Sequence, residues 1–149
     1  MRNRSMAPAV RDGRILMIQT LRRGRFVREL PGGGIEKSET AEQAAIRELK
    51  EECGVDGTVI RPLNTICCKD GSVESVFLVS VPDGQEAVTG TDPEIPDGKE
   101  QRIKDTGWMR LDELSERDRA FLWSCGLMEV EGFYDLVLSW GDDISYPEG

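Results

Sequence analysis

Two Asp-Gly dipeptides, at residues 12–13 and 70–71, each lie between two apolar segments of the sequence. Asp-Gly in this setting is a strong local signal for a β-hairpin, because both residues tolerate the positive φ angles of a tight turn. The first dipeptide predicts antiparallel strands over Ser5–Val10 and Arg14–Thr20. The second predicts another hairpin, formed by residues 58–69 and 72–81. The chain is therefore expected to build its fold around β-structure.

One helix is predicted between the two hairpins. Thr40 suits its N-cap and Gly54 its stop signal, while the alanines between them favour helix. The preceding stretch LPGGGIEKSET is expected to be a loop with exposed backbone, because Pro and three consecutive Gly residues disfavour the interior of a strand.

The second half of the chain predicts a long loop, a strand and another helix. Residues 83–100 are polar and rich in Pro and Gly, and loops of this length in compact domains are often functional. TGWMRL is expected to return to the sheet, and residues 111–127 have helical spacing. Strands that enclose one helix and end in another predict a mixed α/β layered fold, with a single domain over residues 1–149.

Histidine is absent from the 149 residues, which excludes Ser/His and Cys/His catalysis and any His-ligated metal. The net charge of −9 argues against general binding to nucleic acid. Residues 1–28 are nevertheless basic, with eight Arg and one Asp. They form either a solvated basic hairpin or a substrate site, in which one or two of Arg22, Arg23, Arg25 and Arg28 bind phosphates; Arg23, Arg25 and Arg28 are the candidates. The chain has neither an apolar run of membrane-spanning length nor a secretory signal pattern, so a cytoplasmic location is expected.

Three glutamates, Glu48, Glu51 and Glu52, gather at the C-terminal end of the predicted helix, just before Gly54. Each acid there costs about 0.3 to 1 kcal/mol, because the helix dipole leaves that end partially negative. On a helix the three side chains share an arc of roughly 100°, beside the apolar stripe that faces the core. Such a cluster is either a solvated acidic face or an oxygen-rich site for Mg²⁺ or Mn²⁺, and a cation would relieve the repulsion.

A wider pattern surrounds these glutamates. The spacing G-x5-E-x7-R-E-U-x-E-E-x-G-U, with U apolar, is present at Gly33, Glu39, Arg47, Glu48, Leu49, Glu51, Glu52, Gly54 and Val55. At every fixed position it resembles the motif of the Nudix hydrolase family, which favours the metal site. This resemblance implies the Nudix fold, a mixed β-sheet sandwiched between α-helices. It also implies metal-dependent hydrolysis of a diphosphate linkage in a nucleoside diphosphate derivative.

By the family's pattern, Glu48, Glu51 and Glu52 are the candidate ligands of Mg²⁺ or Mn²⁺, helped by the backbone carbonyl of Gly32. Glu39 and Arg47 are expected to pair and to hold the loop against the helix. Glu48 is the first choice for the general base and Glu52 the second.

A loop acid, Glu94 or Glu100, is the third choice for the base. The chain departs from the usual family pattern at Ser38, where many members have Gly, and at Arg28, where an aromatic residue is common. Neither departure removes a metal ligand.

Two further interpretations stay open. Some Nudix domains are ligand sensors without catalysis, although their motif is usually damaged and this one is intact. The aromatic tail, with Phe133, Tyr134 and Trp140, is expected to be core or homodimer contact rather than a base-stacking site.

Overall fold

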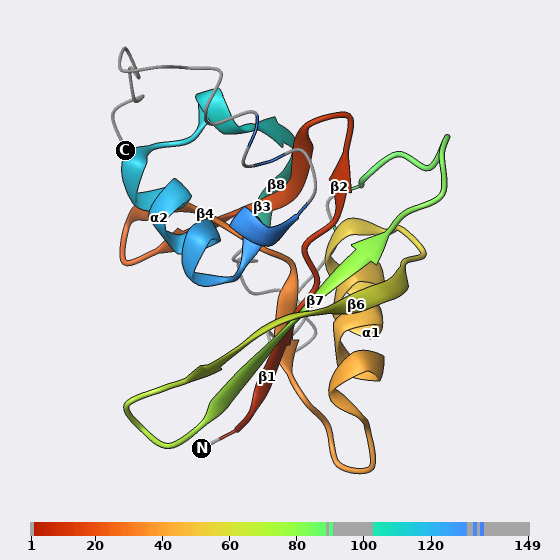
Figure 1. The fold of residues 1–149 in the computed structure, drawn as a ribbon, viewed down its shortest axis with the longest axis vertical. Helices are drawn as coiled ribbons and strands as arrows, with labels where there is room; N and C mark the ends of the chain where they lie inside the picture. The colour runs from red at the N-terminus through yellow and green to blue at the C-terminus, as the bar shows by residue number, and fades with distance from the viewer. Residues whose placement is uncertain (1, 89, 91–102, 131–132, 134, 136–149) are drawn as a thin grey trace.

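The computed structural model describes residues 2–88, 90, 103–130, 133 and 135 (Figure 1). Their backbone forms eight strands, two α-helices and two 3₁₀ turns. In chain order these are β1 (Arg4–Met6), β2 (Val10–Arg11), β3 (Arg14–Arg22), β4 (Arg25–Glu29), β5 (Gly32–Gly34), α1 (Ala41–Cys53), β6 (Thr58–Cys67), β7 (Val73–Ser80), β8 (Ile103–Arg110), η1 (Leu111–Glu113), α2 (Glu116–Ser124) and η2 (Leu127–Glu129). None of the helices in the described residues is long and apolar enough to cross a membrane.

The strands form two sheets. The first has the order β5-β1-β7-β6, and in the second β3 is central, pairing with β2, β4 and β8. Strand β1 runs parallel to β7, and the other pairs are antiparallel, so the sheet structure is mixed. The predicted mixed α/β architecture is confirmed.

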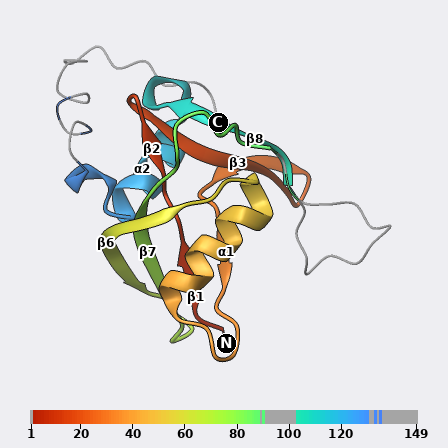
Figure 2. The same ribbon diagram turned by 90° about the vertical axis from the view of Figure 1, so that its right-hand side faces the viewer.

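The core lies on both faces of the strands, because successive side chains of a strand point to opposite faces. In β7, Val76 and Leu78 join a cluster with residues of the α2 region, whereas Phe77 and Val79 join a cluster with α1. Strand β3 alternates in the same way. The helices therefore cover opposite faces, and the strands lie sandwiched between them as the resemblance implied (Figure 1, Figure 2).

The prediction of a single strand over Ser5–Val10 is wrong. The segment splits into β1, which pairs with β5 and β7, and β2, which alone pairs with β3 across the predicted Asp12-Gly13 turn. Pro8 lies at the crossing and has no N–H to donate, while its carbonyl accepts the Val79 N–H at 2.9 Å. Ala7 and Ala9 on either side are fully buried, so small side chains permit the passage from one sheet to the other.

The prediction of a loop through the glycine run is also wrong, because Gly32–Gly34 is the edge strand β5, paired with β1. A Cβ on Gly32 would overlap the Ser5 carbonyl oxygen, and one on Gly33 would overlap the Glu48 carboxyl group. The glycines allow close approach between a strand and its neighbours, which is a use of Gly distinct from turn formation.

The boundaries of α1 are confirmed. The Thr40 hydroxyl accepts the Gln43 N–H at 3.1 Å, the Gln43 side chain accepts the Thr40 N–H at 2.9 Å, and Gly54 ends the helix with φ +70°. The second hairpin and the strand over TGWMRL are confirmed as β6–β7 and β8.

The predicted helix over residues 111–127 is shorter than expected. It is divided at Leu114, where a 3₁₀ turn ends, and Ser115 caps α2 by accepting the Asp118 N–H. Phe133 is 2% exposed and packs in the core, whereas Tyr134 and Trp140 lie outside the described residues.

Candidate active site

The three glutamates of α1 are not a solvated face. Glu48 is 8% exposed and Glu52 is 7% exposed, and both are more than nine-tenths buried although their side chains are acidic. Glu51 is the most open of the three, with 32% of its side chain exposed. Buried carboxylates are uncommon unless other groups pair with them. The contacts around them therefore define the site.

Glu52 is held by the edge strand β5. Its Oε1 accepts the backbone N–H of Gly32 at 2.7 Å. Backbone hydrogen bonds also join the residues that flank β1 and β5, since the Ala7 N–H donates to Pro31 O and the Ile35 N–H donates to Asn3 O. In an antiparallel pair, hydrogen-bonded positions alternate with positions that turn both the N–H and the C=O away from the partner strand. Gly32, directly after the hydrogen-bonded Pro31, is a position of the second kind. The Gly32 carbonyl therefore faces the same open edge as the N–H that contacts Glu52.

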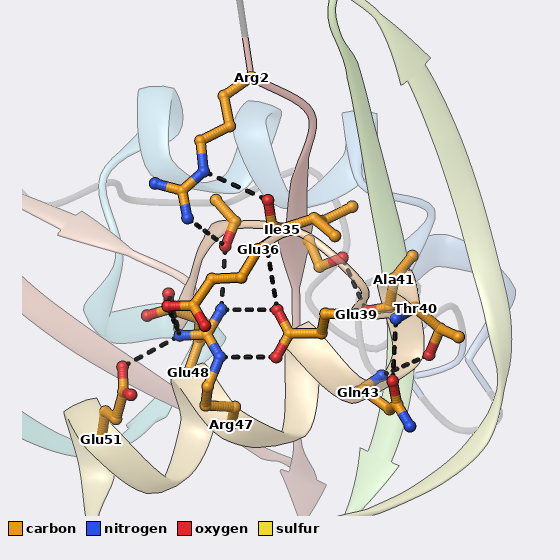
Figure 3. A network of polar contacts seen from close by, with 12 residues as sticks. Arg2, Ile35, Glu36, Glu39, Thr40, Ala41, Gln43, Arg47, Glu48 and Glu51 are labelled. Carbon is orange, nitrogen blue, oxygen red and sulfur yellow. Dashed lines mark hydrogen bonds and ion pairs between the residues drawn. The ribbon is translucent and has the colours of Figure 1, made fainter.

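Arg47 connects the loop before α1 to the acids on the helix (Figure 3). Its Nε donates to Glu39 Oε2 at 2.7 Å and its NH2 donates to Glu39 Oε1 at 2.9 Å, which is a bidentate pair. The NH2 group also donates to the Gly34 carbonyl at 2.9 Å. Glu39 and Arg47, which the resemblance predicted to pair, form this ion pair in the structure.

The third guanidinium nitrogen of Arg47 contacts two of the candidate metal ligands. NH1 donates to Glu48 Oε1 at 2.9 Å and to Glu51 Oε2 at 3.2 Å. A fixed positive charge thus lies between two carboxylates of the cluster, and it offsets part of their mutual repulsion.

The ionisation of Glu39 is strongly perturbed. The hydrogen bonds from Arg47 lower the pKa of Glu39 from 4.5 to about 2 against the opposing effect of burial, and the Glu36 N–H contributes to the lowering. The same pair raises the pKa of Arg47. Both groups are therefore charged throughout the physiological pH range. The ion pair between the loop and the helix does not depend on pH within that range.

A strained turn presents Glu39 to Arg47. The Glu39 N–H donates to Glu36 O at 3.1 Å, and Ser38 in the third position of this turn has φ +70°. Only the third residue of the turn is in the left-handed region, which is the pattern of a type II turn and favours Gly. This explains in physical terms why Gly is common in the family where this chain has Ser38.

Arg2 also contacts the backbone beside the candidate site, and the sequence did not predict this. Its Nε donates to Ile35 O at 3.2 Å, and its NH2 donates to Gly34 O at 3.5 Å, the carbonyl that also accepts from Arg47 (Figure 3). Two guanidinium groups thus hold the backbone that leads from β5 to the turn. In the sequence, the only signal for this contact is the high Arg content of residues 1–28.

The three arginines proposed for phosphate binding are not brought together. Arg23 lies at the tip of the β3–β4 hairpin with φ +50°, and Arg25 follows it in an exposed position. Arg25 and Arg28 point to opposite faces of β4, and Arg28 NH1 donates to Met109 Sδ at 3.6 Å. Within the described part of the chain, no hydrogen bond or ion pair joins the three arginines to the acids of α1. Their role in substrate binding stays a prediction.

The donor set fits a hard divalent cation by its chemistry. The residues that converge at the open edge of β5 offer carboxylate and carbonyl oxygens, which Mg²⁺ and Mn²⁺ prefer. Among the described residues, no three His, Cys, Asp or Glu side chains form a ready-made metal cage. Mg²⁺ normally keeps several waters and takes only one or two carboxylates together with substrate phosphates, so an open arrangement is compatible with it.

The comparisons with known proteins agree with this fold and site. The NUDIX domain family profile matches residues 1–125 of the chain. The protein therefore belongs to the Nudix hydrolase family, and its candidate active site is the Nudix motif of that family.

Among known proteins, the chain is similar to an RNA pyrophosphohydrolase of Sphingopyxis alaskensis, with 46% identity over 52 residues that cover 35% of this chain and 33% of that protein. It is also similar to an 8-oxo-dGTP diphosphatase of Proteus vulgaris, with 53% identity over 38 residues that cover 26% of this chain and 34% of that protein. The matches span about a third of each relative. Among solved structures, a MutT NUDIX hydrolase from Burkholderia pseudomallei superposes with a TM-score of 0.60 and 26% identity, covering 83% of this chain and 96% of that one.

Proposed function

We propose that this protein is a divalent-metal-dependent hydrolase that cleaves the diphosphate linkage of a nucleoside diphosphate derivative. One observation carries the proposal. Glu48 and Glu52 are buried carboxylates on one helix end, and Glu52 is fixed by the Gly32 N–H while Arg47 fixes Glu48. Burying and orienting two acids together is costly in free energy, and such arrangements concentrate at functional sites.

The chemistry of a diphosphate matches such a site. A diphosphate resists attack by water because its own negative charge repels nucleophiles, so most of the catalytic task is neutralising and positioning it. Mg²⁺ or Mn²⁺, when bound, supplies positive charge for the phosphates and lowers the pKa of a bound water. Glu48, Glu51 and Glu52 are the proposed ligands, with the carbonyl of Gly32.

The other site residues have distinct proposed roles. Glu39 and Arg47 are proposed positioning residues, because their ion pair connects the loop to the helix and Arg47 in turn donates to Glu48 and Glu51. Glu48 is the first candidate to accept the proton of the attacking water, and Glu52 is the second. The third candidates, Glu94 and Glu100, lie outside the described residues.

Nucleotides are the proposed substrate class. One relative is named as an RNA pyrophosphohydrolase and the other as an 8-oxo-dGTP diphosphatase, and both names point to nucleotide substrates. The exposed arginines Arg23 and Arg25, together with Arg28, are the proposed phosphate-binding groups. Their charge complements an anionic substrate.

The test is hydrolysis of a panel of nucleoside diphosphate derivatives and triphosphates, with Mg²⁺, with Mn²⁺, and with chelator. We expect turnover of at least one compound, loss of turnover with chelator, and a loss of at least about 100-fold in Glu52→Gln or Glu48→Gln, in the range for removed general bases. Glu42→Gln is the matched control, because Glu42 is exposed in the first turn of the same helix. Absence of turnover on every compound would refute the proposal and favour a ligand-sensing module, and full activity of Glu48→Gln would refute its role as the base.

A further inference from the structure

The residues after β7 cross the C-terminal end of α1. We call Val81–Val88 together with Gly90 the strap; it is the green segment that follows β7 in Figure 1. The strap is outside the Nudix motif, and the sequence predicted most of it only as part of a long polar loop. Its contacts converge on the helix end that carries the candidate metal ligands.

The strap donates hydrogen bonds to the helix end. The Gly90 N–H donates to Glu52 O at 2.9 Å, and the Val88 N–H donates to Cys53 O at 2.8 Å. The last four carbonyl groups of an α-helix have no partner inside the helix. Gly54 N–H satisfies Lys50 O at 3.0 Å, and the strap satisfies two of the remaining carbonyls. The last turn of α1, which carries Glu51 and Glu52, is therefore secured from outside the helix.

Position 90 has room only for glycine, because the helix backbone lies directly against it. A Cβ at this position would overlap the Glu51 carbonyl oxygen and would also crowd the backbone carbon of Glu52. The φ angle of Gly90 is not in the left-handed region, so the backbone conformation itself would accept another residue. Any side chain would therefore have to push the strap away from the helix or displace the last turn.

The other end of the strap is anchored by Arg11. Its NH2 donates to Val81 O at 3.0 Å and to Pro82 O at 2.7 Å, and its guanidinium stacks over the Trp108 ring at 4.6 Å. The strap is also joined to the chain just after α1, because Gln85 Oε1 accepts the Asp56 N–H at 2.8 Å. With both ends fixed, the strap can hold the helix end in one position.

We propose that Gly90 is a positioning residue for the metal site, acting through the backbone of Glu51 and Glu52. Two hydrogen bonds hold Glu52 in place: its carboxylate accepts the Gly32 N–H, and its backbone carbonyl accepts the Gly90 N–H. Moving either contact changes the direction of the carboxylate relative to Glu48. This inference rests on the proposed function for the identity of the ligand, a divalent cation.

The test compares Gly90→Ala with Gly107→Ala. Gly107 lies in β8, has no positive φ, and has no atom near the place of an added Cβ, so it is the matched control for a Gly-to-Ala change. Mn²⁺ binding is measured by titration calorimetry without nucleotide, at a temperature where circular dichroism shows each variant folded. We expect Gly90→Ala to weaken Mn²⁺ binding about tenfold or more, as for other supporting groups around metal sites, and Gly107→Ala to bind as the wild type does.

Equal Mn²⁺ affinity of Gly90→Ala and the wild type would overturn the inference, as would a wild type that does not bind Mn²⁺. Binding without turnover of any nucleotide would refute the proposed function alone, because the comparison of affinities does not depend on catalysis. If turnover is found, kcat at saturating Mg²⁺ and nucleotide should fall in Gly90→Ala while KM for the nucleotide changes less.

Hydrogen exchange on the wild-type protein tests the same contacts without any substitution, should Gly90→Ala fail to fold. The amides of Val88 and Gly90 are expected to exchange as slowly as those in the middle of α1. Exchange at the rate of an unprotected amide would show that the strap is not held on the helix, and the inference would fail.

Discussion

The Glu39–Arg47 pair offers the sharpest test of how the site is held together. Replacing Glu39 with Gln keeps the size of the side chain and removes its charge. The substitution weakens two charge-assisted hydrogen bonds, of 2.7 and 2.9 Å, and places an amide that cannot accept at both positions opposite the guanidinium. The loop should then be held less firmly against α1.

The magnitude follows from the pKa of Glu39. At about 1.4 kcal/mol per pH unit, the fall from 4.5 to about 2 corresponds to about 3 kcal/mol of folding free energy. Glu39 retains 14% exposure of its side chain, so solvent screens part of this interaction and we expect a loss of about 2 kcal/mol at pH 7. For a domain of this size that loss lowers Tm by about 4 to 8 °C.

The pH dependence has a definite sign. The folded-state pKa of Glu39 is lower than the unfolded one, so its contribution is complete above about pH 4.5 and is lost as the pH falls towards 2. Urea unfolding at pH 7 and at pH 3 measures this directly. The difference in unfolding free energy between wild type and Glu39→Gln should shrink by more than half at the lower pH.

Glu42→Gln on the same helix is the control, because its side chain is exposed and the change should cost less than about 0.5 kcal/mol at either pH. A Glu39→Gln loss that stays equal at pH 3 and pH 7 would show that the charge of Glu39 is not what stabilises the loop. If Glu39→Gln lowered the unfolding free energy by less than about 0.5 kcal/mol at pH 7, the Glu39–Arg47 pair would not be important for stability.

Two stability predictions follow from strained or unsatisfied residues. Ser38→Gly should raise the unfolding free energy by about 0.5 kcal/mol, because relief of the left-handed conformation at φ +70° outweighs the added freedom of the unfolded chain; thermal unfolding measures this, and a lower Tm contradicts it. Thr20→Val should raise it by about 1 kcal/mol, because the Thr20 hydroxyl, in a residue that is 2% exposed, has no hydrogen-bond partner in the described structure. Urea unfolding checks the second change, and a destabilised variant would show that the hydroxyl is satisfied in solution.

The features that the sequence predicted are those determined locally. Helix α1 begins at the Thr40–Gln43 capping box and ends at Gly54, and both signals act within a few residues. The spacing of Glu48, Glu51 and Glu52 on one side of that helix is equally local. The class of fold followed from such elements and from the resemblance to the Nudix motif.

The features that the sequence did not predict depend on residues that are distant in the chain. The glycines of β5 have the composition of a loop, and they form a strand because β1 pairs with them, while the nearby Ser5 carbonyl and Glu48 carboxyl leave no room for a larger side chain. The division of Ser5–Val10 depends on the Val79 N–H that pairs with Pro8 O. In each case tertiary contacts decided between two local conformations, which propensity alone does not distinguish.

The electrostatic argument for a cation also changes once these contacts are known. From the sequence, a bound cation is one way to relieve the repulsion of three carboxylates at a negative helix end, which costs about 0.3 to 1 kcal/mol for each. In the structure, Arg47 already contacts Glu48 and Glu51, and N–H groups from Gly32 and Gly90 point at the carboxylate and the carbonyl of Glu52. These groups offset part of the repulsion without a metal. The acid cluster is therefore not by itself a reason for a cation, and the case for one rests on the burial and fixed direction of Glu48 and Glu52 beside an open, oxygen-rich edge.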